Sequence, residues 1–352
     1  MLTCQMRKCV GQLISAKRLV LHSSKTNMAD EEEHLWQISS FVFNFIFKGL
    51  VAVAVLFTAT ILTKFFSYER DSHISNLVDT NFCRSSECLR CSHKLTKSPL
   101  ETAELLLTKL DEFARVKSDK GELDRLYKAI EYNRTQKKRN NFSSAQKPTV
   151  FYLYGLSGRP WHDCLSDQLT TLVCSENFEM IRSEFNQIRF NASDEGWVKN
   201  LTPEGDWLVY HLINQGERVV NNCRKCPLSV EIIESLELII KGCSFGNALF
   251  SVVRAGTHIT AHYGPTNCRI RCHLPLYVPN NCRLCVNGQE RMWNERELLL
   301  FDDSFLHEAW HKGVDSERVV LMVDLWHPEI TAVEKEALAF MFPPRSHVAD
   351  IP

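Results

Sequence analysis

The carboxyl-terminal half of this 352-residue chain contains residues whose types and spacing could bind a metal ion. The segment "HYGPTNCRIRCHLPL" begins at His262. Non-haem iron sites commonly combine two histidines with one carboxylate, and Asp or Glu often stands two residues after the first histidine. Here Gly264 stands at that position. The pattern alone leaves three interpretations open: a damaged site, a site with fewer ligands, or no metal site.

The segment from Cys268 to Leu276 alternates between charged and apolar residues. The period of two in a strand places Arg269, Arg271 and His273 on one face. The opposite face carries Ile270, Cys272, Leu274 and Leu276. This pattern is typical of a barrel wall with one apolar side and one cationic side that could hold an anion. A solvated basic face is the alternative interpretation.

Two later segments add a second histidine and an arginine. "LLLFDDSFLHEAWH" places His307 after an apolar run and a turn, and "ERVVLMVDLWHP" places Arg318 at the start of another strand. Histidines from different strands can meet on one metal ion, and an arginine beyond them can bind a carboxylate through two parallel hydrogen bonds. This order of residues predicts a metal site beside an anion site at the mouth of a barrel.

Other polar residues in these segments are assigned simpler roles. Asp302 and Asp303 could replace the missing ligand, but carboxylates beside a ligand histidine more often support the ligands or close a turn, which is the role we favour. Glu308 is predicted to be a solvated surface charge. Structural or supporting roles are predicted for His258, His311 and His327.

Short strand-like runs predominate after Thr149. The strand candidates are residues 149–154, 206–213, 248–253, 268–278, 282–286, 298–301 and 318–326. Helical stretches near residues 176–186 and 230–241 interrupt them, and Thr331 with Glu334 has the spacing of a capping box that begins a helix. The pattern predicts a mainly β fold with flanking helices, namely a jelly roll (double-stranded β-helix) or a related barrel.

A long apolar stretch precedes all of these elements. From Phe41 to Phe66 the chain is apolar apart from Asn44, Lys48, Lys64 and a few hydroxyl groups. A run of this length can cross a hydrocarbon core of about 30 Å at about 1.5 Å per residue. It begins too late for a signal peptide, and no small-residue cleavage site follows it. We therefore predict one transmembrane helix over residues 41–66, anchored in membrane lipid.

Cysteines and glycosylation sequons predict the orientation of this anchor. Of the 14 cysteines, only Cys4 and Cys9 precede the apolar stretch. The Asn-x-Ser/Thr sequons all follow it, at Asn133, Asn141, Asn191 and Asn200. Both features are typical of the secretory lumen. We predict a single-pass type II membrane protein of the endoplasmic reticulum, with a cytosolic amino terminus and a lumenal carboxyl-terminal domain.

Changes in composition divide the chain into four parts. Residues 1–40 form a cytosolic segment in which Met28 could replace Met1 as the start of translation. Residues 67–145, after the anchor at 41–66, form a stem with cysteines, a helical pattern over Pro99–Lys128 and a basic linker. Residues 146–345 form the main domain. A formal net charge of −1 favours no nucleic-acid partner.

Two cysteine clusters have spacings that suit either disulfides or zinc. The first contains Cys83, Cys88, Cys91 and His93, and the second is the Cys-x-x-Cys pair of Cys223 and Cys226. In an oxidising lumen we favour disulfides for both, with zinc as the alternative at the first. Redox catalysis is not predicted at the second, because no thioredoxin-like βαβ pattern surrounds it.

Several segments resemble the aspartyl/asparaginyl β-hydroxylase family of iron- and 2-oxoglutarate-dependent oxygenases. The resemblance to the family is carried by "RAGTHITAHYGPTNCRIRCHL" and "LLLFDDSFLHEAWH". Further segments resemble its short membrane-anchored members, the aspartate β-hydroxylase domain-containing proteins, namely "NFCRSSECLRCSHK", "NCRKCP" and "VVLMVDLWHP". The resemblance covers roughly residues 80–342. It implies a jelly-roll oxygenase domain and a type II topology.

The resemblance also implies a role for individual residues. His262 and His307 match the family's two iron(II) ligands, and Arg318 matches the arginine that pairs with the distal carboxylate of 2-oxoglutarate. Further contacts to this co-substrate are implied for Trp207, Ser251, Arg271 and His273. Gly264 matches as well, because the family lacks the usual carboxylate ligand. Without that ligand the iron is one charge more positive, so the doubly negative co-substrate alone must neutralise it.

The favoured function is therefore a dioxygenase that uses iron(II), 2-oxoglutarate and O₂ to hydroxylate a lumenal protein substrate at Asp or Asn side chains. Substrates with EGF-like domains are an expectation from the family's best-known member. The alternative is a catalytically silent, membrane-anchored binding or scaffold protein that keeps the fold. Halogenation is a remoter alternative, since Gly264 leaves room for chloride. Succinate formation that depends on His262 and His307 would distinguish the enzyme from the scaffold.

Overall fold

The computed structural model describes residues 98–117, 120–139, 145–163, 167–190, 195–314 and 316–344. All of these belong to the second of two compact units, residues 81–352. The predicted anchor over residues 41–66, the proposed start at Met28 and the cysteine cluster at residues 83–93 lie outside the described residues. Among the described residues, no helix is both long enough and apolar enough to span a membrane.

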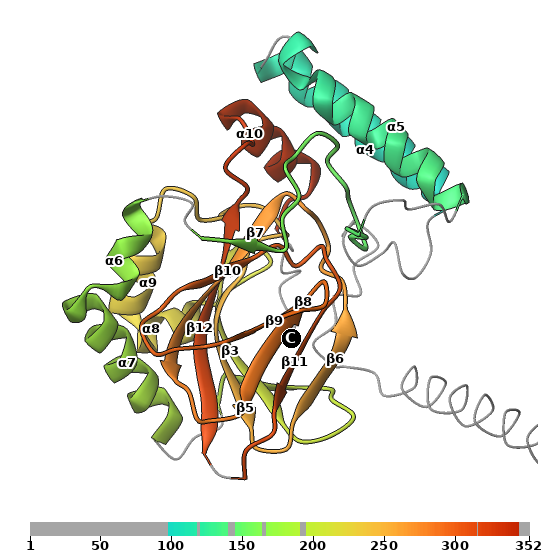
Figure 1. Ribbon diagram of the computed structural model, residues 1–352. Coiled ribbons are helices and arrows are strands. Elements are labelled where there is room, and N and C mark those ends of the chain that lie inside the picture. The colour runs from blue at the N-terminus through green and yellow to red at the C-terminus, as the bar shows by residue number, and fades with distance from the viewer. Residues whose placement is uncertain are drawn as a thin grey trace, which may run out of the picture. The chain divides into compact units, whose positions relative to one another are not determined.

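Two antiparallel sheets form the centre of this unit (Figure 1). The larger sheet contains β10 (Leu299–Phe301), β7 (Arg269–Tyr277), β12 (Glu317–Trp326) and β5 (Ala248–Arg254), in that spatial order. The smaller sheet contains β6 (His258–His262), β11 (His307–His311), β8 (Cys282–Val286) and β9 (Gln289–Met292). This strand order is that of a double-sheet jelly roll. The predicted mainly β fold with flanking helices is confirmed.

Additional strands widen the larger sheet. They are β1 (Trp161–His162) beside β10, β3 (Trp207–Asn214) beside β5, β2 (Trp197–Asn200) beside β3, and the short β4 (Glu217–Arg218), which also pairs with β3. The predicted strands at residues 206–213, 268–278 and 318–326 correspond to β3, β7 and β12.

Helices precede, interrupt and follow the strands. They are α4 (Pro99–Lys117), η2 (Lys120–Leu123), α5 (Asp124–Arg139), η3 (Asp167–Leu169), α6 (Thr170–Val173), α7 (Ser175–Phe190), α8 (Val220–Lys225), α9 (Pro227–Glu234) and α10 (Ala332–Met341). Helices α6 to α9 lie along one side of the larger sheet (Figure 1).

The alternation of β7 assigns its two faces as the sequence predicts. Its apolar residues Ile270, Cys272, Leu274 and Leu276 are fully buried in one cluster with Phe185 of α7 and Ile233 of α9. The transfer of one such side chain from water contributes about 1.5–3 kcal/mol. Helices thus cover the outer face of the larger sheet. The polar residues of β7 lie on its other face and point to the space between the two sheets.

A helical hairpin packs against the carboxyl-terminal helix. The sequence predicts one helical pattern over Pro99–Lys128, whereas the structure has two helices, α4 and α5, separated by η2. Leu110 and Leu126 of the hairpin share a buried cluster with Leu338 of α10. The described part of the predicted stem therefore shares a buried cluster with α10 and with Trp326, the last residue of β12.

One ion pair joins this hairpin to α10. Arg125 Nε donates to Glu334 Oε1 at 2.7 Å, and its Nη2 pairs with Oε2. The same Glu334 side chain accepts from the backbone N–H of Thr331, whose hydroxyl accepts from Glu334 N, so the predicted capping box is confirmed. Glu334 is only 3% exposed and serves two functions at once.

Three local predictions are wrong or weakened. Residues 149–154 form no extended strand: Phe151 makes only an isolated parallel bridge with Thr266, and Leu153 N donates to the side chain of Asn267 instead of to a backbone carbonyl. Cys223 and Cys226 form no disulfide: the first thiol bonds to a backbone carbonyl, while the second is buried in the core. Asn133 is a poor glycosylation acceptor, since its amide makes three hydrogen bonds inside the fold.

We predict that Glu334→Ala lowers the free energy of unfolding by about 2 kcal/mol or more, because it leaves the Arg125 guanidinium without its carboxylate and removes half of a capping box. Chemical denaturation monitored by circular dichroism measures the loss. The matched control is Glu336→Ala on the same helix, where Glu336 is 59% exposed and lies 3.7 Å from Lys117. A change within about 0.5 kcal/mol is expected there. Equal losses in both variants would contradict the assignment.

Candidate active site

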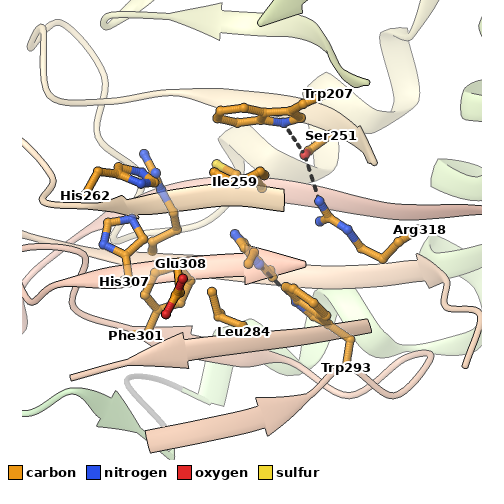
Figure 2. A pocket seen from close by; sticks show the side chains of 14 residues that line it. Trp207, Ser251, Ile259, His262, Leu284, Trp293, Phe301, His307, Glu308 and Arg318 are labelled. Carbon is orange, nitrogen blue, oxygen red and sulfur yellow. Dashed lines mark hydrogen bonds between the residues drawn. The ribbon is translucent and has the colours of Figure 1, made fainter. Parts of the chain in front are cut away.

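A single pocket between the two sheets contains all seven residues to which the resemblance assigns a role (Figure 2). They are Trp207, Ser251, His262, Arg271, His273, His307 and Arg318. They come from β3, β5, β6, β7, β11 and β12, so both sheets contribute. Other lining side chains include Ile259, Leu284, Trp293, Phe301, Glu308 and Met322. Segments more than 100 residues apart in sequence thus meet at one place.

Two histidines face each other at one end of the pocket (Figure 2). His262, the last residue of β6, is the register partner of His307, the first residue of β11. Their ring centroids lie 4.1 Å apart. His307 is 4% exposed, whereas His262 lies at the open side of the pocket. Strand pairing therefore fixes the two imidazoles side by side.

Backbone carbonyls determine which nitrogen of each ring is available. His262 Nδ1 lies 2.8 Å from Thr260 O, and His307 Nδ1 lies 2.9 Å from Phe305 O. A carbonyl only accepts, so in each neutral ring Nδ1 carries the proton and Nε2 keeps its lone pair. Burial, with a contribution from His262, lowers the pKa of His307 to about 3. Desolvation also lowers the pKa of His262. Both rings are neutral near pH 7, as metal ligands must be.

The other end of the pocket contains a buried positive charge. Arg318 is 3% exposed, and no carboxylate among the described residues forms an ion pair with it. Its Nη2 donates to Ser251 Oγ at 3.4 Å, and Trp207 Nε1 donates to the same oxygen at 3.0 Å. Its guanidinium lies over the ring of Trp293, 4.8 Å from the centroid. Burial lowers the pKa of Arg318 to about 10, which still leaves it protonated near neutrality.

A second donor lies near this arginine. His273 Nδ1 accepts from Trp293 Nε1 at 3.1 Å, which places the proton of the neutral ring on Nε2. That buried Nε2 has no hydrogen-bond partner among the described residues. Burial, followed by the charges of Arg318 and Arg271, lowers the pKa of His273 well below its usual range. The two groups together fit a carboxylate, because an unpaired buried cation and donor are costly until an anion pairs with them.

Arg271 differs from Arg318 because it is already paired. Its Nε donates to Asp324 Oδ1 at 2.9 Å, and its Nη1 lies 3.3 Å from Asp303 Oδ2. Arg269 binds the same two aspartates, so two arginines and two aspartates form a buried cluster without net charge. Arg271 lines the pocket, but most of its charge is neutralised there.

The position of Gly264 is explained by one of these aspartates. A Cβ atom added to Gly264 would lie 2.4 Å from Cγ and Oδ1 of Asp303, which is too close for any side chain. The backbone N–H of Gly264 also donates to Asp303 O at 2.6 Å. Asp303 thus occupies the space that a ligand at position 264 would need. Among the described residues, no group of three or more His, Cys, Asp or Glu side chains could hold a metal ion.

Glu308 does not behave as the sequence predicts. It lines the pocket, is 33% exposed and pairs with His258 Nε2 at 2.9 Å, so it is not a solvated surface charge. The register between β11 and β6 shifts between His307 and Ala309, and such a bulge turns a side chain away from its regular direction. His311 and His327 are buried, and each accepts from a nearby backbone N–H through Nδ1, which fits structural roles.

Asp302 turns away from the histidine pair. Its Oδ2 accepts from Gln146 Nε2 at 2.6 Å and its Oδ1 accepts from Ser304 N at 2.9 Å. This agrees with the predicted role in a turn. Burial raises the pKa of Asp302 to about 7.

Sequence reasoning missed several pocket residues. Met322 could have been found, since it lies four residues after Arg318 on the same face of β12. Trp293 follows β9 in a stretch without periodicity, so no local signal indicates its contact with His273. Arg269 does not line the pocket itself. The sequence places it on the same face of β7 as Arg271, but nothing in the sequence indicates that it binds Asp303.

The fold and pocket define a class of protein: jelly rolls with two neutral histidines and a buried cation between the sheets. A family model described as Aspartyl/Asparaginyl beta-hydroxylase matches residues 175–328. Aspartate beta-hydroxylase domain-containing protein 2 of Homo sapiens is 43% identical over 269 residues, which is 75% of this chain and 71% of the relative. The chain belongs to the aspartyl/asparaginyl β-hydroxylase family.

The chain is also similar, over shorter stretches or in fold alone, to two more distant proteins. The aspartyl/asparaginyl beta-hydroxylase of Homo sapiens is 35% identical over 210 residues, which is 57% of this chain and 27% of the relative. The solved structure of HygX from Streptomyces hygroscopicus, with nickel and 2-oxoglutarate bound, has a TM-score of 0.31. It is 10% identical and covers 48% of this chain and 89% of that chain. A TM-score this low carries no assignment of function.

We predict that Gly264→Ala lowers the free energy of unfolding by about 1–3 kcal/mol, because the added methyl group overlaps the buried Asp303 carboxylate. Urea denaturation measures the change. Gly121→Ala is the control, since a Cβ there meets nothing within 4 Å, and a change within about 0.5 kcal/mol is expected. Stability unchanged by Gly264→Ala would mean that Asp303 does not occupy this space.

We also predict a pH dependence that comes from Asp302. Because burial raises its pKa from 3.8 to about 7, the folded protein holds this proton more tightly than the unfolded chain. Its contribution to stability is complete below about pH 4 and is lost as the pH rises through 7. In Asp302→Asn the side chain is neutral throughout, so the wild-type stability should fall relative to the variant between pH 4 and 8. Parallel curves in urea denaturation would refute the prediction.

Proposed function

We propose that this chain is an iron(II)- and 2-oxoglutarate-dependent dioxygenase that hydroxylates Asp or Asn side chains of a protein substrate. One observation carries the proposal: a pair of neutral histidines and a buried arginine, which has no carboxylate partner in the described part of the chain, occupy opposite ends of one pocket (Figure 2). Membership of the aspartyl/asparaginyl β-hydroxylase family supports the reaction class.

The histidine pair fits iron(II). His262 and His307 both direct their Nδ1 protons to backbone carbonyls, which leaves two Nε2 lone pairs from register-paired residues. Imidazole nitrogen is a common iron ligand, and a hydrogen bond from the second ring nitrogen fixes the ring and raises its basicity. Iron(II) held here would activate O₂, which is the oxidant, for the hydroxylation of an unactivated C–H bond, with 2-oxoglutarate converted to succinate and CO₂.

The arginine end fits the distal carboxylate of 2-oxoglutarate. Arg318 can form a charge-assisted pair with it, His273 Nε2 can donate a hydrogen bond, and Ser251 is held by Trp207 to present its hydroxyl group. A co-substrate bound in this way would point its oxo-acid group toward the histidine end. Arg271 has N–H groups left after its bonds to Asp324 and Asp303, so it remains a candidate for a further contact.

The proposed substrate and compartment rest on the sequence. We propose a lumenal protein substrate, with EGF-like domains as the first class to test, and a type II membrane anchor over residues 41–66 in the endoplasmic reticulum. The names of the relatives, which specify aspartyl and asparaginyl side chains, support the residue class. Asn141, Asn191 and Asn200 remain the proposed glycosylation sites.

The competing functions make different demands on the pocket. A silent scaffold needs no unpaired cation, so the cost of burying Arg318 alone argues for a site that binds an anion. Halogenation needs a chloride near the iron. The Asp303 carboxylate beside Gly264 disfavours another anion at that place, which makes hydroxylation the better-supported chemistry.

The experiment uses purified full-length protein with iron(II), 2-oxoglutarate, O₂ and candidate EGF-like peptides. Succinate should form, and His307→Ala should abolish it. Arg318→Met should raise the KM for 2-oxoglutarate by about 30-fold or more, because it removes the partner of a buried carboxylate. Arg283→Met is the matched control, since Arg283 is 44% exposed and lies outside the pocket. Metal binding without succinate from any substrate would favour the scaffold.

A further inference from the structure

The chain contains a carboxylate beside the place where its missing ligand would stand. All three atoms of the Asp303 carboxyl group lie within 2.5 Å of the Cβ position of Gly264, two residues after His262. Asp303 is 0% exposed, and its charge influences both His262 and His307. A carboxylate that could act as a third ligand therefore lies near the histidine pair. Among the described residues, however, no group of three or more His, Cys, Asp or Glu side chains could hold a metal ion.

Arg269 explains why this carboxylate is held in place. Its Nε donates to Asp303 Oδ1 at 3.2 Å and its Nη2 donates to Oδ2 at 2.5 Å, so one guanidinium binds both oxygens. Although burial opposes ionisation, the charges of Arg269 and Arg271 lower the pKa of Asp303. The carboxylate is therefore charged and could bind a metal if it were free.

Arg269 itself has little freedom to move. It is 1% exposed, and its Nη1 donates to Phe245 O at 2.6 Å and to Asp324 Oδ2 at 2.9 Å. A planar guanidinium that binds two oxygens of one carboxylate is the most specific geometry available to an arginine. The pair is fixed by partners on both sides.

We propose that Arg269 is a positioning residue that keeps Asp303 away from the iron and so limits the protein ligands to His262 and His307. The inference rests on the proposed function. With Asp303 neutralised, the protein adds no net charge to the metal, and the two negative charges of 2-oxoglutarate balance iron(II). If Asp303 were released, it would compete for the metal and repel the co-substrate.

The proposal predicts two affinities that change in opposite directions. In Arg269→Met, the dissociation constant for Co(II), used as an air-stable substitute for iron(II), should fall about tenfold. The dissociation constant for 2-oxoglutarate on the Co(II) protein should rise by about the same factor. The visible absorption of Co(II) should change as a carboxylate joins the metal. A purely structural defect would weaken both ligands together.

The double variant Arg269→Met/Asp303→Asn should lose the gain in Co(II) affinity, because the gain depends on the released carboxylate. Circular dichroism checks the fold of each variant. If Arg269→Met does not fold, Arg269→Lys replaces it, since one ammonium cannot bind both oxygens in the same way; the same opposed shifts, smaller in size, are then expected.

Two results would overturn the inference. One is a folded Arg269 variant that weakens both ligands or changes neither. The other is a single Asp303→Asn variant that loses Co(II) as fully as His307→Ala, since Asp303 would then already be a ligand. A wild-type protein that binds neither Co(II) nor 2-oxoglutarate would instead refute the proposed function, so the two failures are distinguishable.

Discussion

The pocket depends on a buried cluster of two arginines and two aspartates. Arg269 and Arg271 of β7 bind Asp324 of β12 and Asp303 in the turn before β11, so one charge network joins both sheets. Burial of four charges is costly, and only complete pairing and hydrogen bonding offset it. Because the loss of any one member leaves an uncompensated charge, the cluster fixes the relative position of the strands that carry His262, His307 and Arg318.

The cluster also explains how Arg318 differs from the other arginine that lines the pocket. Arg271 and Arg318 both line the pocket, but Arg271 has two aspartate partners and Arg318 has none among the described residues. Asp303 and Asp324 are thus neutralised by arginines, whereas the positive charge of Arg318 at the far end of the pocket has no carboxylate partner among the described residues. Under the proposed function, this asymmetry would orient a bound dicarboxylate, with one carboxylate paired with Arg318 and the other end directed toward the histidines.

The sequence predicts the larger sheet well and the smaller sheet poorly, for a physical reason. Strands β7 and β12 have one face against helices, so Leu274 and Leu321 belong to clear apolar alternations. The segment His258–His262 forms β6, but its exposed edge has no apolar period and carries no strand signal. The sequence indicates His262 and His307 through their residue type and their match to metal-ligand motifs, and not through strand periodicity. Glu308 was misassigned because its direction depends on a bulge that only strand pairing reveals.

Gly264 shows the limit of local patterns most clearly. In the sequence, Gly264 stands where a carboxylate ligand is expected. In the fold, glycine is the only residue type that fits at this position, because Asp303 occupies the space that a side chain would need. The two residues are 39 positions apart, and nothing near either one indicates the contact. A change that restored a carboxylate at 264 would have to displace Asp303 from Arg269 and so expose a buried arginine. The absence of a carboxylate at position 264 therefore follows from the charge cluster, and one substitution at Gly264 cannot reverse it.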